Sequence, residues 1–119
     1  MSYVDGFIVP VPKAKLAAYR ALARKACKVW LEHGALDYQE YIADDAPVGK
    51  TTSFPRSVKL KPGEIVVFSY IVYKSRRDRD RINGKVMKDP RLAKMMNPKA
   101  MPFDGKRLIY GGFKTLVAA

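Results

Sequence analysis

Apolar residues alternate along some stretches of the chain and recur at helical spacing along others. Residues 3–11 (YVDGFIVPV) mix aromatic and β-branched side chains, which indicates a strand. Pro10 and Pro12 mark the end of this strand because proline lacks an amide donor. From Pro12 to His33 the apolar residues recur every three or four positions, which predicts a helix that stops before Gly34.

The middle of the chain predicts two further strands separated by a long loop. Residues 35–45 (ALDYQEYIADD) alternate between apolar and polar positions, as a half-buried strand does. Residues 64–73 (EIVVFSYIVY) are the most strongly β-forming segment of the chain. Repeated proline and glycine residues predict a loop over 46–63, with a short extended piece near 57–60.

The remainder of the chain predicts a second helix and a last strand. Ser75 and Asp78 have the spacing of a capping box, which indicates where this helix begins. Pro90 follows an aspartate and ends it. The pattern therefore predicts a helix over 75–88, a short helical turn over 91–96 and a final strand over 107–117.

These elements follow one another in the order βαββαβ, which is that of the ferredoxin-like, split βαβ arrangement. We therefore expect an α+β fold with a four-stranded antiparallel sheet and two helices on one face. A chain of 119 residues favours a single domain, residues 1–119, with one hydrophobic core.

The predicted strands are apolar on both faces, although a sheet with helices on one face needs only one apolar face. We assign the aromatic residues Phe7, Phe68 and Tyr70, together with Asp5, to the face away from the helices. Such a patch would exceed the few hundred Å² that monomers usually expose. The simplest cover is the same face of a second copy, which predicts a homodimer; a partner protein or RNA are the alternatives.

Composition and charge change this picture in one respect. Hydrophobic residues make up 48% of the chain, as in a folded domain, but the formal net charge of +12 is unusually high. Such a charge favours polyanions, including nucleic acid, although basic helix faces are most often simply solvated. Nucleic acid is therefore a weaker partner assignment than a second copy of the chain.

The sequence indicates no metal site, cofactor or membrane segment. Cys27 is the only cysteine and His33 the only histidine, so neither a zinc site built on cysteines nor a histidine-rich site is supported. The first residues lack the pattern of a signal peptide, and no apolar run approaches the roughly 20 residues that span a bilayer. We expect a soluble cytoplasmic protein without a membrane partner.

Several segments resemble an uncharacterised bacterial family. The runs YVDGFIVPVPK, WLEHGAL, VVFSYIVYKSR, KVMKDPRL and MPFDGKRLIYGGF are similar to those of DUF1428, the YbaA-like proteins, and the match extends from about Tyr3 to Val117. The resemblance implies a dimeric α+β barrel, in which two ferredoxin-like subunits join their sheets. It implies no particular activity, and no catalytic residue of the wider superfamily matches a position here.

The candidate site residues are polar and aromatic side chains that we expect to meet in a cavity between the sheet faces of the dimer. Asp5, Tyr38, Glu40, Tyr70 and Tyr110 would line this cavity, and Arg107 could hold an anion in it. The alternative role for these residues is hydrogen bonding across the dimer interface. Whether such a cavity only binds a small molecule or also transforms it is left open by the residues.

His33, Phe7 and Phe68 complete the set of candidates. His33 suits acid–base chemistry, but the last turn of a helix also favours a histidine for structural reasons. Phe7, Phe68 and Tyr70 stand where an RNA-recognition domain stacks bases, yet residues 64–73 lack the basic residue and glycines of that motif. A dimer without chemistry is the third alternative.

Overall fold

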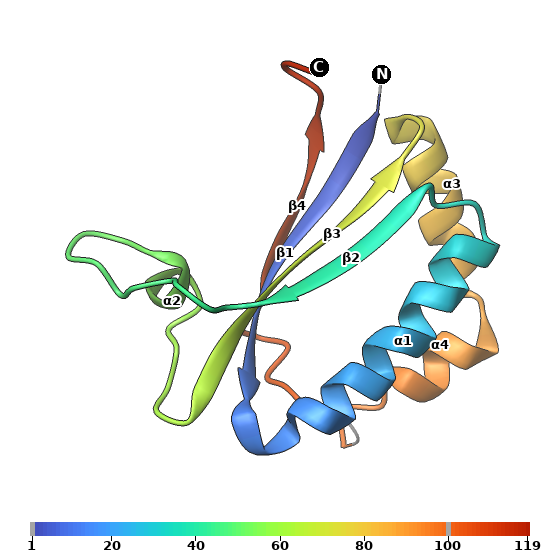
Figure 1. The fold of residues 1–119 in the computed structure, drawn as a ribbon. Coiled ribbons are helices and arrows are strands. Elements are labelled where there is room, and N and C mark those ends of the chain that lie inside the picture. The colour runs from blue at the N-terminus through green and yellow to red at the C-terminus, as the bar shows by residue number, and fades with distance from the viewer. Residues whose placement is uncertain (1, 100) are drawn as a thin grey trace.

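The computed structural model describes residues 2–99 and 101–119, and its helices and strands are shown in Figure 1. In chain order the elements are β1 (Tyr3–Pro12), η1 (Lys13–Lys15), α1 (Leu16–Glu32), β2 (Asp37–Ile42), α2 (Phe54–Ser57), β3 (Glu64–Tyr73), α3 (Arg76–Met87), α4 (Pro90–Met95) and β4 (Ile109–Lys114).

The four strands form one sheet in the order β2-β3-β1-β4, and each neighbouring pair is antiparallel. Helices α1, α3 and α4 lie on one side of this sheet, whereas α2 and its flanking loops lie on the other (Figure 1). The α+β class and the four-stranded antiparallel sheet predicted from the sequence are therefore confirmed.

Strand register decides which side chains share a face, because directly paired residues point to the same side of a sheet. Phe7 and Glu40 both pair with Ser69, and Tyr110 pairs with Phe7. These four residues form one row across the face that α1, α3 and α4 cover, which we call the helix-covered face. Phe68 precedes Ser69 in β3 and points to the opposite, open face.

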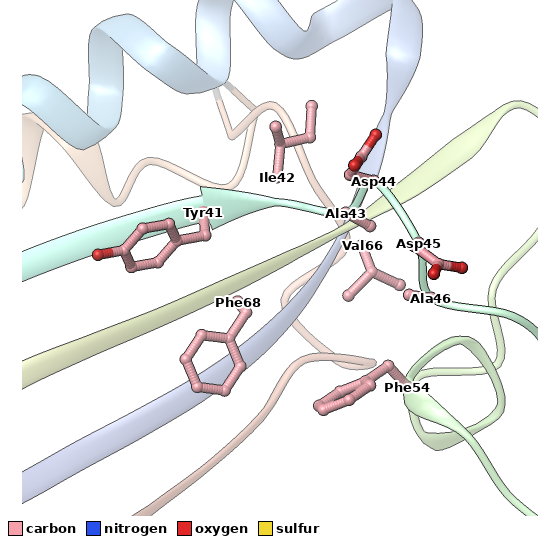
Figure 2. A pocket seen from close by; sticks show the side chains of 9 residues that line it. All are labelled: Tyr41, Ile42, Ala43, Asp44, Asp45, Ala46, Phe54, Val66 and Phe68. Atoms are coloured by element: carbon pink, nitrogen blue, oxygen red, sulfur yellow. The ribbon is translucent and has the colours of Figure 1, made fainter.

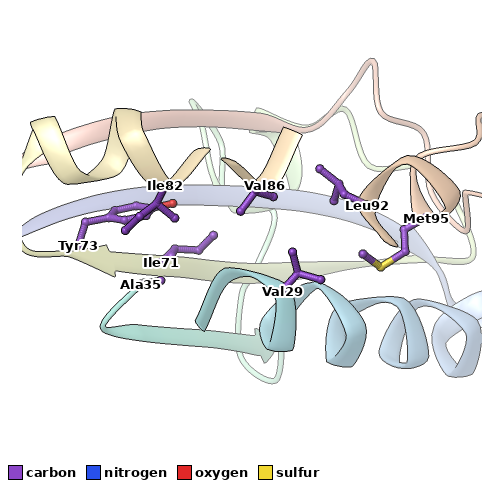
Figure 3. Close-up of a cluster of buried hydrophobic side chains, with 8 residues drawn as sticks. All are labelled: Val29, Ala35, Ile71, Tyr73, Ile82, Val86, Leu92 and Met95. Atoms are coloured by element: carbon purple, nitrogen blue, oxygen red, sulfur yellow. The ribbon is translucent and has the colours of Figure 1, made fainter. Parts of the chain in front are cut away.

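The main core lies between the helix-covered face and the helices (Figure 3). Val29 of α1 packs there with Ile71 and Tyr73 of β3 and with Ile82 and Val86 of α3, and all five are at most 3% exposed. Each such burial stabilises the fold by about 1.5–3 kcal/mol, so these contacts fix α1 and α3 on the sheet.

One end of the open face is covered by the segment that contains α2. Val58 packs there against Ile8 and Val66. Residues 57–60 were predicted as a short extended piece, and this prediction is wrong because α2 ends at Ser57 and a turn follows it. Ser53 caps α2 by accepting a 3.1 Å hydrogen bond from the Arg56 amide, and a proline in the first turn favours the helix further.

The remaining predicted elements differ from the observed ones mainly at their ends. The predicted cap is confirmed, because the Ser75 hydroxyl accepts a 3.1 Å hydrogen bond from the Asp78 amide at the start of α3. The first helix begins as the 3₁₀ turn η1 and becomes α-helical only at Leu16. β2 and β4 are shorter than predicted, since only their central residues pair with β3 and β1.

Candidate ligand-binding cavity

A cavity of about 420 Å³ lies between the helix-covered face and the helices. This volume falls within the range of small-molecule sites, roughly 300–1,000 Å³. Several strand residues that line the cavity are site residues predicted from the sequence: Asp5, Phe7, Tyr38, Glu40 and Tyr110. The structure thus brings together a large part of the predicted site, on a different face from the one predicted.

The expectation that Asp5 and Phe7 share a face with Phe68 and Tyr70 is wrong. Phe7 pairs with Ser69, whose chain neighbours are Phe68 and Tyr70, so Phe7 lies on the opposite side of the sheet from both. The error arose because both faces of β3 are apolar, and alternation alone then gives no preferred register.

Apolar side chains form most of the cavity wall and also its rim. Phe103 and Leu22 are among the lining residues. At the rim, Met87 is 63% exposed, Met96 49% and Tyr110 76%. Tyr110 stacks on Phe7 with ring centroids 6.1 Å apart, so the aromatic lining continues from the interior to the surface. The cavity is therefore open to solvent at an apolar mouth.

Glu40 forms the first polar cluster of the cavity. Its Oε2 atom accepts a 2.7 Å hydrogen bond from the Tyr38 hydroxyl, and its Oε1 atom accepts one from the Tyr19 hydroxyl. Burial raises the pKa of both tyrosines well above the usual range, and the negative charge of Glu40 raises it further. Both phenols therefore stay protonated and act as donors to Glu40.

Asn83 of α3 is the centre of the second polar cluster. Its Oδ1 atom accepts hydrogen bonds from the Trp30 indole at 3.0 Å and from the Tyr73 hydroxyl at 3.2 Å. Its Nδ2 atom lies 3.5 Å from Oδ2 of Asp5, which is only 5% exposed. Burial, together with the charge of Asp5, raises the pKa of Tyr73. This cluster joins α1, α3 and β1 through polar groups inside the domain.

Arg79 closes the same end of the cavity. Its Nη2 atom donates a 3.0 Å hydrogen bond to the Tyr3 hydroxyl, and its guanidinium lies 5.1 Å from the centre of that ring. Nε lies 3.8 Å from Oδ1 of Asp5 and is buried without a hydrogen-bond partner among the described residues. Gly112 makes room for this arrangement, because a Cβ atom there would lie 2.9 Å from Nη2.

His33 lies outside the lining of the cavity. Its Nε2 atom is 2.9 Å from Oδ2 of Asp89, the N-cap residue of α4. Hydrogen bonds from Arg91, and then from His33, hold the pKa of Asp89 well below its usual range. Arg91 also pairs with Glu32 at 2.6 Å. These contacts tie the end of α1 to the start of α4, which supports the structural interpretation of His33.

Arg107 also lies away from the cavity lining. Its guanidinium pairs with Glu64 at 2.6 Å and Asp104 at 3.0 Å, and it donates a 3.0 Å hydrogen bond to the Lys59 carbonyl. Hydrogen bonds from Arg107 lower the pKa of Glu64. These partners engage the guanidinium, so Arg107 holds the chain before β4 to β3 and to the loop after α2.

Phe68 and Tyr70 belong to the open face, where a second and smaller hollow of about 250 Å³ lies beside α2 (Figure 2). Phe68 packs edge-on against Phe54 of α2, with ring centroids 6.3 Å apart. Tyr70 stacks on Tyr41 at 6.2 Å. Because Phe7 is on the other face, the three aromatic residues compared with an RNA-binding surface do not form one platform.

The sequence did not single out Tyr19, Trp30, Ser69, Asn83 and Arg79, although all of them line the cavity. Tyr19 and Trp30 belong to the apolar stripe of α1, and such a stripe predicts packing in the core and not a binding site. Arg79 is one of many basic residues in α3, so neither charge nor spacing distinguishes it.

Among the described residues there is no cluster of histidine, cysteine or acidic side chains that could hold a metal ion. None of the helices within residues 2–99 and 101–119 is long and apolar enough to cross a membrane.

Comparison with known proteins places the chain in a family. Residues 2–105 match the family described as "Protein of unknown function (DUF1428)". The chain belongs to this family. It is 50% identical over 117 residues to the DUF1428 relatives named "Uncharacterized protein YbaA" of Escherichia coli K12 and of Shigella flexneri, with 98% of each chain covered. The resemblance inferred from the sequence is therefore confirmed.

A solved structure resembles this member of the DUF1428 family in fold. It is that of Rv0793 from Mycobacterium tuberculosis, which matches with a TM-score of 0.60 over 100% of this chain and 99% of its own. The two sequences are 16% identical, so the similarity concerns the α+β fold alone.

Proposed function

We propose that this protein binds a small, largely apolar molecule in the cavity under the helix-covered face. The observation that carries the proposal is the distribution of polar groups. The cavity wall is mainly apolar, and its hydrogen-bonding groups are gathered in two clusters, around Glu40 and around Asn83. Binding sites for small molecules combine an apolar wall with a few fixed polar groups that set orientation.

Both clusters are held by neighbours before any ligand arrives. Tyr19 and Tyr38 fix the Glu40 carboxylate, and Trp30 and Tyr73 fix the Asn83 side-chain amide. Such preorganisation favours binding because little side-chain freedom is lost when the ligand enters.

The proposal is tested by filling the cavity. Ala26→Phe adds a ring to the part of α1 that lines it, whereas Ala21→Phe makes the same change on the exposed side of that helix. A fragment library screened by thermal shift should give hits with the natural protein and with Ala21→Phe, and none of these hits with folded Ala26→Phe. Hits that bind all three proteins equally, or no hits at all, would refute the proposal.

A second proposal concerns the topology of the subunit and its assembly. We infer that the subunit is ferredoxin-like and that two copies join open face to open face as a dimeric α+β barrel. Supporting this, the order β2-β3-β1-β4 agrees with that fold, and Phe68, Ile109 and Phe113 are between 41% and 63% exposed on the open face. A second copy would bury these residues together, which removes an apolar patch from water.

Nucleic-acid binding is the second candidate function, favoured by the charge of α1. Arg20, Arg24 and Lys28 are exposed along its outer side, and α1 contains no acidic residue before Glu32. Such a stripe could follow a phosphate backbone. Gel shifts at low salt test this function: retarded RNA or DNA, with affinity that falls steeply as salt is added, would support it. Unretarded nucleic acid would eliminate it.

A further inference from the structure

The Glu40 carboxylate lines the cavity, and no cationic side chain among the described residues pairs with it. Lysine and arginine number 23 against 11 acidic residues, yet within residues 2–99 and 101–119 no basic side chain forms an ion pair with Glu40. The other charged residues of the lining are Asp5 and Arg79, which face each other at 3.8 Å. Arg79 is also 3.2 Å from Asp80, so its charge is already engaged.

The carboxylate of Glu40 retains capacity to accept further hydrogen bonds. A carboxylate offers about four lone-pair positions, and the hydroxyls of Tyr19 and Tyr38 use one on each oxygen. Phenol donors ease the cost of removing the carboxylate from water, but they leave its charge in place. A ligand with a positive charge and N–H donors would supply both the opposite charge and the further hydrogen bonds that the carboxylate can accept.

The surroundings of Glu40 also suit a cation. Phe7, Trp30 and Tyr38 line the same cavity, and the rings of Trp30 and Tyr38 lie 6.3 Å apart at a tilt. The faces of aromatic rings attract ammonium groups because the π electrons make the ring face negative. Ser69, the residue paired with Glu40 in the sheet, adds a hydroxyl to the cavity floor and is only 6% exposed.

We propose that the ligand is an apolar amine whose ammonium group binds the Glu40 carboxylate while its apolar body fills the rest of the cavity. This inference deepens the proposed function and rests on it. Neutral apolar molecules would also enter the cavity, but they would bind more weakly because they leave the charge of Glu40 unmatched.

The test compares two probes of the same shape, naphthylethylamine and naphthylethanol, by isothermal titration calorimetry. With the natural protein the amine should bind at least about tenfold more tightly, which corresponds to about 1.4 kcal/mol. Glu40→Gln removes the charge but keeps the shape, and should bring the two affinities within about twofold of each other. Glu32→Gln is the matched control, because Glu32 pairs with Arg91 outside the cavity lining, and it should keep the full preference.

Tyr38→Phe is a second control, which separates loss of the charge from disturbance of the structure around it. It removes one hydrogen bond of the same cluster but keeps the carboxylate. This variant should still prefer the amine. Equal binding of the two probes by the natural protein, or a preference that survives in Glu40→Gln, would overturn the amine assignment and leave the proposed function standing. If neither probe binds and the fragment screen is also empty, the proposed function fails with it.

Discussion

Tyr38 donates a 2.7 Å hydrogen bond to Glu40, the residue two positions further along β2 on the same face of the sheet. Tyr19 approaches the same carboxylate from α1, so the cluster connects a helix to the edge strand that it covers. A half-buried carboxylate held by two phenols is thus part of the packing of α1 as well as of the candidate site.

Removing one phenol should therefore destabilise the fold. Tyr19→Phe deletes a donor to a charged acceptor, and such hydrogen bonds contribute about 1.5–3 kcal/mol to stability. Urea unfolding should show a loss of this size. Tyr110→Phe, which removes a hydroxyl from a residue that is 76% exposed, should change stability by less than about 0.5 kcal/mol. An equal effect of the two substitutions would contradict the role of the cluster.

Gly112 should tolerate no side chain where Tyr3 and Arg79 meet. A Cβ atom there would lie 2.8 Å from Cε1 of the Tyr3 ring, so Gly112→Ala should displace the ring and cost about 1–3 kcal/mol. Gly84→Ala is the control: a Cβ atom at this helical glycine meets nothing within 4 Å, and the change should stabilise α3 by about 0.5–1 kcal/mol. Thermal unfolding of both variants checks the prediction, which fails if Gly112→Ala is neutral.

The ion pairs of Asp89 should make stability depend on pH. Its pKa is lowered in the folded protein, so its contribution is complete above its ordinary pKa of 3.8 and is lost as the pH falls toward the folded value. Asp89→Asn keeps a good N-cap but removes the charge, and should flatten the acid limb of the stability curve. Asp45→Asn, at an exposed position, should leave that limb unchanged in denaturant titrations across acidic pH. Identical acid limbs in the natural protein and in Asp89→Asn would contradict this role.

A charge on the open face should separate the proposed dimer. The Phe113 ring lies over Gly6 and Gly111 and is 63% exposed, so Phe113→Lys places a cation within the proposed interface. Light scattering should give twice the chain mass of 13.4 kDa for the natural protein and the single mass for this variant. Leu116→Lys, beyond the end of β4, should remain dimeric. A natural protein of 13.4 kDa would refute the dimer.

The sequence predicts much of this fold because local signals agree with long-range packing in several elements. The β-forming run 64–73 coincides with β3, and Ser75 caps α3 as its spacing with Asp78 indicates. The α2 helix was missed because a capping serine and one turn of helix are weak signals within a loop rich in proline and glycine.

The candidate site was predicted in part, and the failure has a physical cause. Asp5, Tyr38 and Glu40 do line one cavity, but the register that separates Phe7 from Phe68 depends on pairing between strands far apart in the chain. Two apolar faces look alike in sequence. Only the placement of the helices distinguishes the covered face from the open one.

The most direct measurement of ligand binding in the cavity is the NMR signal of the Trp30 indole. Trp30 is the only tryptophan, it lines the cavity, and its Nε1–H donates to Asn83. On addition of naphthylethylamine, the single indole resonance should move with saturation in the natural protein and in Ala21→Phe, and should stay fixed in Ala26→Phe. An indole signal that stays fixed in all three proteins, or moves equally in all three, would contradict the account.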